Sequence, residues 1–146
     1  MLIIYCDGSG QGFPGLPGGW GFVVLREDTV LDSGAGGERQ TTNNHMEVRA
    51  AIAGLESALG LRRGDEGIEL VTDSRLTIDV AEGRDVPTRL EAESAQLRGL
   101  FLEAGAMARW VRGHSGERWN EQVDELARAA RLKVTSAKAR RRLLAR

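Results

Sequence analysis

Apolar and polar positions form distinct blocks along the chain, and the first block predicts a buried strand. Leu2–Cys6 is an almost continuous apolar run, which is typical of a strand covered on both faces. A glycine-rich stretch follows, and the runs at Trp20–Leu25 and Thr29–Ser33 predict two further strands joined by turns. The opening of the chain therefore predicts a three-stranded antiparallel meander.

From Asn43 the spacing of the apolar residues becomes that of a helix. Residues three or four positions apart share one helix face, and this face collects Val48, Ile52, Leu55 and Leu59. The polar run 41–44 supplies candidate N-caps, and Gly60 is a natural stop. The pattern predicts a helix from about residue 43 to residue 60.

Strands and helices alternate in the rest of the chain. The predicted elements are a strand at Ile68–Thr72, a helix starting near Asp73 and Ser74, a helix opened by Pro87 and running to about Glu103, a strand at Ala106–Val111 and a helix at Asn120–Leu132. This order predicts an α/β fold with a mixed sheet and helices packed on its faces.

Length and charge describe one domain with a basic end. A chain of 146 residues accommodates one domain of ordinary size. Its net charge of −1 hides a split, because residues 128–146 hold 8 basic side chains and no acid, whereas residues 1–127 carry a net charge of −9. We interpret residues 1–132 as the folded domain and residues 133–146 as a basic C-terminal tail. A nucleic-acid partner is compatible with this distribution, because the field near a surface follows the local charge.

Several classes of protein are excluded by what the sequence lacks. A lone Cys6 excludes an intramolecular disulfide framework and any zinc site built from cysteines. The N-terminus has no basic region and reaches an acid at Asp7, so it does not read as a signal peptide. No apolar run approaches the roughly 20 residues that cross a bilayer. We expect a soluble, cytoplasmic monomer with no membrane contact and no small-molecule organic cofactor.

Four carboxylates stand at positions where predicted elements begin or end. Asp7 ends the first strand, Asp73 ends the fourth, Glu47 lies in the first turn of the first long helix and Asp124 lies early in the last helix. If the first and fourth strands are neighbours, Asp7 and Asp73 face each other at one end of the sheet. Glu47 and Asp124 each border an apolar stripe, so both could lean over that same end.

Clustered acids need a counter-charge, because neighbouring carboxylates repel each other and raise each other's pKa. Mg²⁺ is a hard ion that takes oxygen ligands and keeps several waters, and Mn²⁺ is the alternative. Two such ions about 4 Å apart can activate a water and stabilise the leaving oxygen of a phosphodiester. Each acid taken alone is more often a turn or capping residue. The spacing of the four acids is therefore compatible both with a metal enzyme and with a set of turn and capping residues.

Five sequence blocks favour the metal-enzyme interpretation. They are Asp7-Gly8-Ser9 before a loop ending in Gly18-Gly19-Trp20-Gly21, Thr41 to Glu47, Thr72-Asp73-Ser74, Gly113-His114-Ser115-Gly116, and Asn120-Glu121 with Asp124 to Ala127. In this order and spacing they closely resemble the bacterial type 1 ribonuclease H family over roughly residues 1–131. The resemblance implies a mixed five-stranded sheet of order 3-2-1-4-5, with the first three strands antiparallel and helices on both faces. It also implies an endonuclease that hydrolyses the RNA strand of RNA/DNA hybrids with two Mg²⁺ ions.

The resemblance also assigns residues to roles. The family's metal-binding carboxylates fall on Asp7, Glu47, Asp73 and Asp124, and its mobile-loop histidine, which assists proton transfer or product release, falls on His114. Asn43 and Asn44 match the pair that reads the 2′-OH in the minor groove, and Thr42 matches a contact to a DNA phosphate. The backbone N–H groups of Gly8, Ser9, Gly10 and Gln11 are expected to approach the RNA, because glycine removes side-chain obstruction.

The sequence departs from the family pattern in two places. Many members carry a basic, Trp-rich protrusion, whereas Val80–Glu103 contains five acids and no Trp, so we expect weaker unaided affinity for the hybrid. Arg75 stands where a substrate-contacting Gln is common, and Arg can donate a hydrogen bond but cannot accept one. The basic tail could compensate for the lost protrusion by neutralising phosphates, or it could be a solvated helix end.

Three other functions share features with this sequence. Exonucleases of the proofreading type carry Asp-x-Glu on the first strand, and position 9 here is Ser. A dinucleotide-binding domain would need a helix after Gly8–Gly12, where the sequence predicts a strand. A catalytically weak or silent hybrid-binding module of the same fold is the remaining alternative, and the presence of all four acids argues against it.

Overall fold

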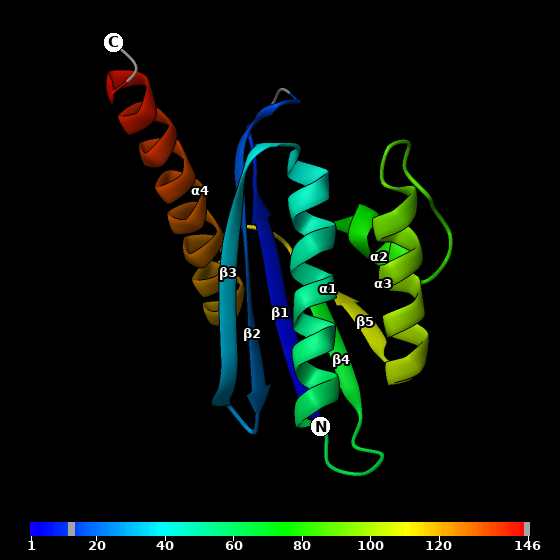
Figure 1. Ribbon diagram of the computed structural model, residues 1–146. Helices are drawn as coiled ribbons and strands as arrows, with labels where there is room; N and C mark the ends of the chain where they lie inside the picture. The colour runs from blue at the N-terminus through cyan, green and yellow to red at the C-terminus, as the bar shows by residue number, and fades with distance from the viewer. Residues whose placement is uncertain (12–13, 145–146) are drawn as a thin grey trace.

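The computed structural model describes the backbone of residues 1–11 and 14–144, and the side chains of those residues as far as residue 135. Its elements follow the predicted order (Figure 1). They are β1 (Leu2–Ser9), β2 (Leu16–Arg26), β3 (Thr29–Thr41), α1 (Asn43–Leu61), β4 (Ile68–Thr72), α2 (Arg75–Ala81), α3 (Glu91–Ala104), β5 (Met107–Trp110) and α4 (Arg118–Leu144).

The strands form one five-stranded sheet in the order β3-β2-β1-β4-β5. Strands β1, β2 and β3 are antiparallel neighbours, whereas β4 pairs parallel to β1 and β5 pairs parallel to β4. The predicted mixed sheet is therefore confirmed. Because β1 and β4 run in the same direction, their C-terminal ends lie at the same edge of the sheet.

Helices cover both faces of the sheet (Figure 1). Alternate residues of β1 face opposite sides of it. Leu2, Ile4 and Cys6 belong to the core beneath α1, α2 and α3. Tyr5 belongs to a second core with Trp119 and Val123 of α4. The odd-numbered positions of β1 therefore point to the α4 face. Asp7 lies on that side by the same alternation.

The first three strands are longer than the sequence pattern predicted, because glycines that resemble chain breakers lie inside them. A Cβ at Gly19 would come within 2.2 Å of the Ala127 carbonyl oxygen in α4, and one at Gly21 within 2.7 Å of Leu126 Cβ. In β3, a Cβ at Gly36 would meet the Trp20 ring at 2.6 Å. These positions lack side chains so that α4 and an aromatic ring can pack directly on the sheet.

Two predicted helix boundaries were wrong. Pro87 does not open α3: residues 87–90 form a turn in which the Leu90 N–H donates to the Pro87 carbonyl at 3.0 Å, and the helix begins at Glu91. The last helix continues past Leu132 to Leu144, so the backbone of the proposed tail is part of α4. Val134 packs against Gly37 of β3, and this contact extends the helix–sheet interface beyond residue 132. The side chains of residues 136–146, which include most of the tail's basic residues, lie outside the described part of the structure.

No helix in the described part of the chain is both long and apolar enough to cross a membrane.

Candidate active site

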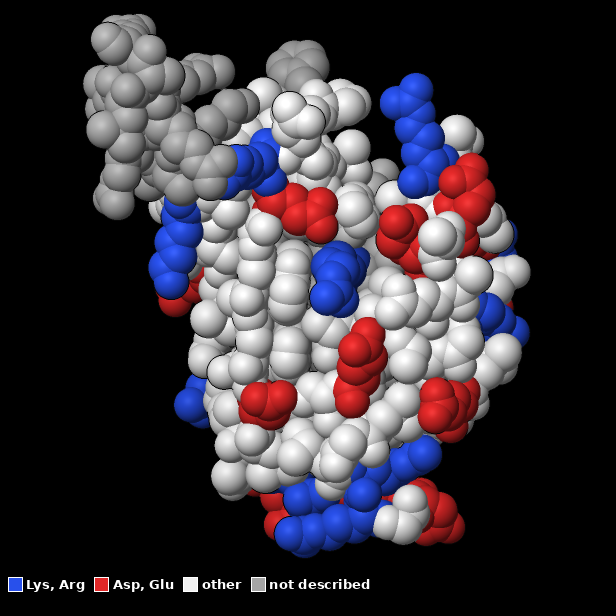
Figure 2. All heavy atoms as spheres, in the orientation of Figure 1, with Lys and Arg blue, Asp and Glu red and all other residues white. Residues whose placement is uncertain are grey.

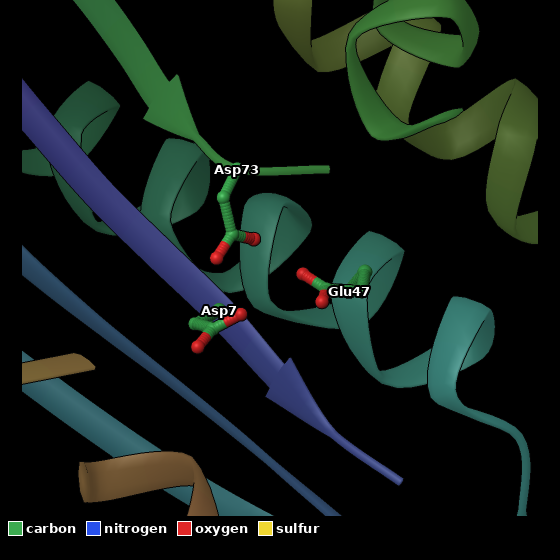
Figure 3. Close-up of side chains that lie close together, drawn as sticks. All are labelled: Asp7, Glu47 and Asp73. Carbon is green, nitrogen blue, oxygen red and sulfur yellow. The ribbon is translucent and has the colours of Figure 1, made fainter. Parts of the chain in front are cut away.

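Three carboxylates from distant parts of the chain converge at the edge where β1 and β4 end. Asp7, Glu47 and Asp73 each offer an oxygen such that these atoms lie within 4.8 Å of one another, and Figure 3 shows the side chains turned toward a common point. The predicted convergence of these three acids is therefore present.

The geometry of β1 and α1 refines how two of these acids reach the point. β1 does not end at Asp7: it continues along β2 to Ser9, whereas its pairing with β4 stops at Tyr5. Asp7 therefore stands just beyond the β1–β4 ladder. Glu47 lies in the second turn of α1 rather than the first, because the helix begins at Asn43.

Gly8 allows α1 to approach β1 closely enough to deliver Glu47. A Cβ at this position would fall 2.4 Å from the Glu47 backbone nitrogen, so no other residue fits without moving the helix. The Gly8 N–H lies within hydrogen-bonding distance of two carboxylates, at 3.0 Å from Asp7 Oδ1 and 3.1 Å from Glu47 Oε2. That this N–H approaches RNA stays a prediction, and in this structure the group donates to carboxylates of the protein itself.

Burial and mutual repulsion raise the pKa of all three carboxylates. Burial, followed by the charge of Asp73, raises the pKa of Asp7 from 3.8 to about 8. The pKa of Glu47 is raised well above its usual value by burial and by the charge of Asp7, and burial also raises that of Asp73. Such a cluster holds fewer than three negative charges at neutral pH unless a cation offsets them. An all-oxygen donor set of this kind fits a hard divalent cation better than it fits zinc.

Asp124 borders the cluster without being one of its three converging members. It lies on α4, where Arg128 donates to its Oδ2 at 2.6 Å. Its charge nevertheless raises the pKa of both Asp7 and Asp73, so it faces the same edge of the sheet. The bond from Arg128 uses only Oδ2, so Asp124 keeps a second carboxylate oxygen that could act as a fourth ligand.

The loop that carries His114 lies against Asp73. A Cβ at Gly113 would come 2.9 Å from Asp73 Oδ2, so glycine lets the loop lie this close to the carboxylate as it stands. His114 itself is exposed and has a backbone φ of 54°, a left-handed conformation that is uncommon outside glycine. Its charge lowers the pKa of Asp73. The structure thus places an exposed imidazole at the rim of the acidic cluster.

The side chains of Asn43 and Asn44 do not cap α1. The side chain of Thr42 caps the helix by accepting from the His45 N–H at 3.1 Å, so neither Asn43 nor Asn44 is needed as the cap. Asn43 Oδ1 instead accepts from the Gly10 N–H at 3.0 Å, which means that this N–H, like that of Gly8, is already engaged. Both asparagine side chains are exposed.

A cavity of about 290 Å³ opens beside these residues. Thr42 and Asn44 line it together with the turn that precedes α3, including Thr88 and Arg89. Sequence analysis did not single out this turn, because its basic residue is isolated in an acidic segment. Arg89 has a backbone φ of 71°, which only the structure reveals.

Arg75 begins α2, immediately after the cap residue Ser74. Its guanidinium lies 3.9 Å from the centre of the Trp110 ring in β5. The Trp110 Nε1–H donates in turn to the backbone carbonyl of Asp73 at 3.0 Å. Arg75 is therefore close to the acidic cluster, on its β5 side.

A family model for RNase H matches residues 1–131. The chain belongs to the ribonuclease H family. Among curated relatives, the ribonuclease H of Rhizobium meliloti is 38% identical over 138 residues, which cover 86% of each chain. The ribonuclease H of Marinobacter nauticus is 40% identical over 139 residues, covering 86% of this chain and 90% of the relative.

Solved structures of this family have the same fold. The N-terminal RNase H domain of a Mycobacterium tuberculosis protein superposes with a TM-score of 0.80 at 29% identity, over 94% of this chain and 97% of the other. A ribonuclease H1 named LC11, solved in complex with an RNA/DNA hybrid, superposes with a TM-score of 0.78 at 27% identity, over 92% and 99% of the two chains. The ribonuclease H-like fold predicted from the sequence is confirmed.

Proposed function

We propose that this chain is an endonuclease that hydrolyses the RNA strand of RNA/DNA hybrids. The observation that carries the proposal is the convergence of Asp7, Glu47 and Asp73 within 4.8 Å in a chain of the ribonuclease H family. A related ribonuclease H1 has been solved on an RNA/DNA hybrid, which supports this duplex as the partner. In the proposed enzyme, the three carboxylates hold divalent cations, with Asp124 as a further ligand.

The donor set supports two Mg²⁺ ions, with Mn²⁺ as the alternative. Bound there, the ions would supply an activated water and stabilise the leaving oxygen of the phosphodiester. The protein's own part is to hold three oxygens at fixed spacing, through the Gly8 N–H bonds to Asp7 and Glu47 and through the Trp110 bond to the Asp73 carbonyl. His114, exposed on the loop beside Asp73, would accept or return a proton during turnover.

Recognition of the hybrid is proposed for the exposed surface next to the acids. The exposed amides of Asn43 and Asn44 can both donate to and accept from a 2′-hydroxyl, the group that distinguishes RNA from DNA. Thr42, which lines a cavity together with Arg89, is the proposed contact to a phosphate of the DNA strand. Ser9 and Gln11 remain proposed contacts of the glycine-rich loop.

Affinity for the duplex is expected to depend on few cations near the site. Segment 82–90, between α2 and α3, contains no additional helix that could form a basic protrusion. On the face drawn in Figure 2, the largest group of described basic side chains lies around the loop between α1 and β4, at the opposite edge of the sheet from the acids. We therefore retain the basic end of α4 as a candidate phosphate contact.

The deciding experiment is product mapping on RNA/DNA, RNA/RNA and DNA/DNA duplexes of one sequence, with Mg²⁺, with Mn²⁺ and with EDTA. We expect internal cuts in the RNA strand of the hybrid only, and none in EDTA. Asp73→Asn should be inactive, whereas Asp65→Asn, which removes one exposed charge at the opposite edge, should match the parent. Binding of the hybrid without cleavage would instead support the silent binding module. Light scattering of the same preparation tests the expected monomer.

A further inference from the structure

Trp110 and Arg75 form a cation–aromatic pair directly beside the acidic cluster. The Arg75 guanidinium carbon lies 3.9 Å from the Trp110 ring centre, which is within the range of a strong cation–π contact. Trp110 sits opposite Thr72 in the β4–β5 ladder, and its Nε1–H donates to the Asp73 carbonyl at 3.0 Å. The pair is thus fixed to the same backbone segment that presents Asp73.

The guanidinium of this pair keeps its hydrogen-bond donors available. Stacking uses the face of the guanidinium, whereas its N–H groups point outward in the plane. Arg75 is exposed, and it takes part in no ion pair with the residues whose side chains the structure describes. By contrast, Arg84 and Arg109 both bond to carboxylates. Arg75 is therefore an oriented cation whose donors have no acid partner among the described side chains.

The surroundings favour a phosphate as the ligand for this cation. Three carboxylates repel a polyanion, so a fixed positive charge at their rim offsets part of that repulsion. A planar guanidinium can bind two phosphate oxygens at once. An amide side chain at this position would carry no positive charge. Arg75 follows Asp73 by two residues, so its reach is limited to backbone close to the bond that is cleaved.

We propose that Trp110 orients Arg75 to bind a backbone phosphate of the nucleic acid next to the cleavage site. This inference rests on the proposed function, and it assigns Trp110 a positioning role in substrate affinity. It also explains how a chain without a basic, Trp-rich protrusion retains a strong contact to the duplex. A guanidinium held in place loses less conformational entropy on binding than a free one does.

The test measures the Kd of a labelled RNA/DNA duplex by fluorescence anisotropy in EDTA, at salt concentrations from 50 to 200 mM. The proteins compared are the parent, Arg75→Gln, Trp110→Leu and the double variant. Loss of one phosphate contact lowers the slope of log Kd against log salt by about 0.9. The ratio of the Arg75→Gln Kd to the parent Kd should therefore shrink about threefold over this range. Arg63→Gln, an exposed arginine at the opposite edge, is the matched control and should keep the parent's slope.

Trp110→Leu should raise Kd as Arg75→Gln does, and the double variant should be no worse than Arg75→Gln alone. Circular dichroism and thermal melting confirm that each variant is folded. Additive losses in the double variant would refute the positioning role. An unchanged salt slope in Arg75→Gln, or a change confined to particular base sequences, would refute the phosphate contact. A parent that binds the hybrid but does not cleave it refutes the proposed function and leaves this binding inference standing.

Discussion

Substituting Asp7 by Asn should abolish cleavage and at the same time stabilise the metal-free protein. The carboxylate is 3% exposed and faces two other acids, and its pKa in the folded protein is about 8. The amide is nearly isosteric: its oxygen can still accept from the Gly8 N–H, and its nitrogen can donate to Glu47. The substitution therefore removes a buried titratable group, and with it the cost of holding that group protonated in the fold, without opening a cavity.

The size of the stabilisation follows from the pKa. Between about pH 4 and pH 8, folded Asp7 retains a proton that the unfolded chain has released, so the free energy of unfolding falls as pH rises through this window. At pH 7 the difference from the usual pKa of 3.8 corresponds to about 4 kcal/mol. Relaxation around the site reduces this ceiling, and we expect a measured gain of about 2 kcal/mol, or roughly 6 °C in Tm.

Urea denaturation in EDTA at pH 7 and at pH 4 provides the assay, with Asp65→Asn as the control. The gain for Asp7→Asn should be present at pH 7 and nearly absent at pH 4, which is close to the unfolded pKa of 3.8, so that the folded and unfolded states differ little in bound protons. Mg²⁺ should then stabilise the parent and not the variant, because only the parent keeps the full ligand set. A variant less stable than the parent at pH 7 in EDTA, or one that cleaves the hybrid, would refute the reasoning.

Three further substitutions or truncations test other parts of the structure. His114→Ala should lower kcat about 10- to 100-fold without the complete loss expected for Asp7→Asn, and single-turnover kinetics on the hybrid will show whether proton transfer or release is slowed. Gly8→Ala should reduce both stability, by at least about 2 kcal/mol, and activity, because a Cβ would displace α1; normal thermal melting would contradict this. Truncation after residue 135, which preserves the Val134 contact to β3, should raise KM at moderate salt and leave kcat nearly unchanged. An unaltered KM across a salt series would exclude a role of this end of the chain in binding the duplex.

Local sequence pattern determined most of the fold. The apolar run at Leu2–Cys6 and the helical spacing from Val48 to Leu59 predicted elements that are present, because burial of one face or two imposes its period on the sequence. The helix boundaries were less predictable. Pro87 satisfies the local preference for a first helical position, yet tertiary packing places it in a turn and starts α3 at Glu91.

What the sequence by itself determined about this protein was the set of chemical groups and the order of the elements that carry them. The converging acids were predictable, since parallel β1 and β4 must end at one edge. Only the tertiary structure decided how the space around them is used. It showed that Gly8 allows the close approach of α1 to β1 and that Trp110 stacks on Arg75. These are contacts between side chains or backbones whose partners lie in other elements, and local periodicity contains no information about them.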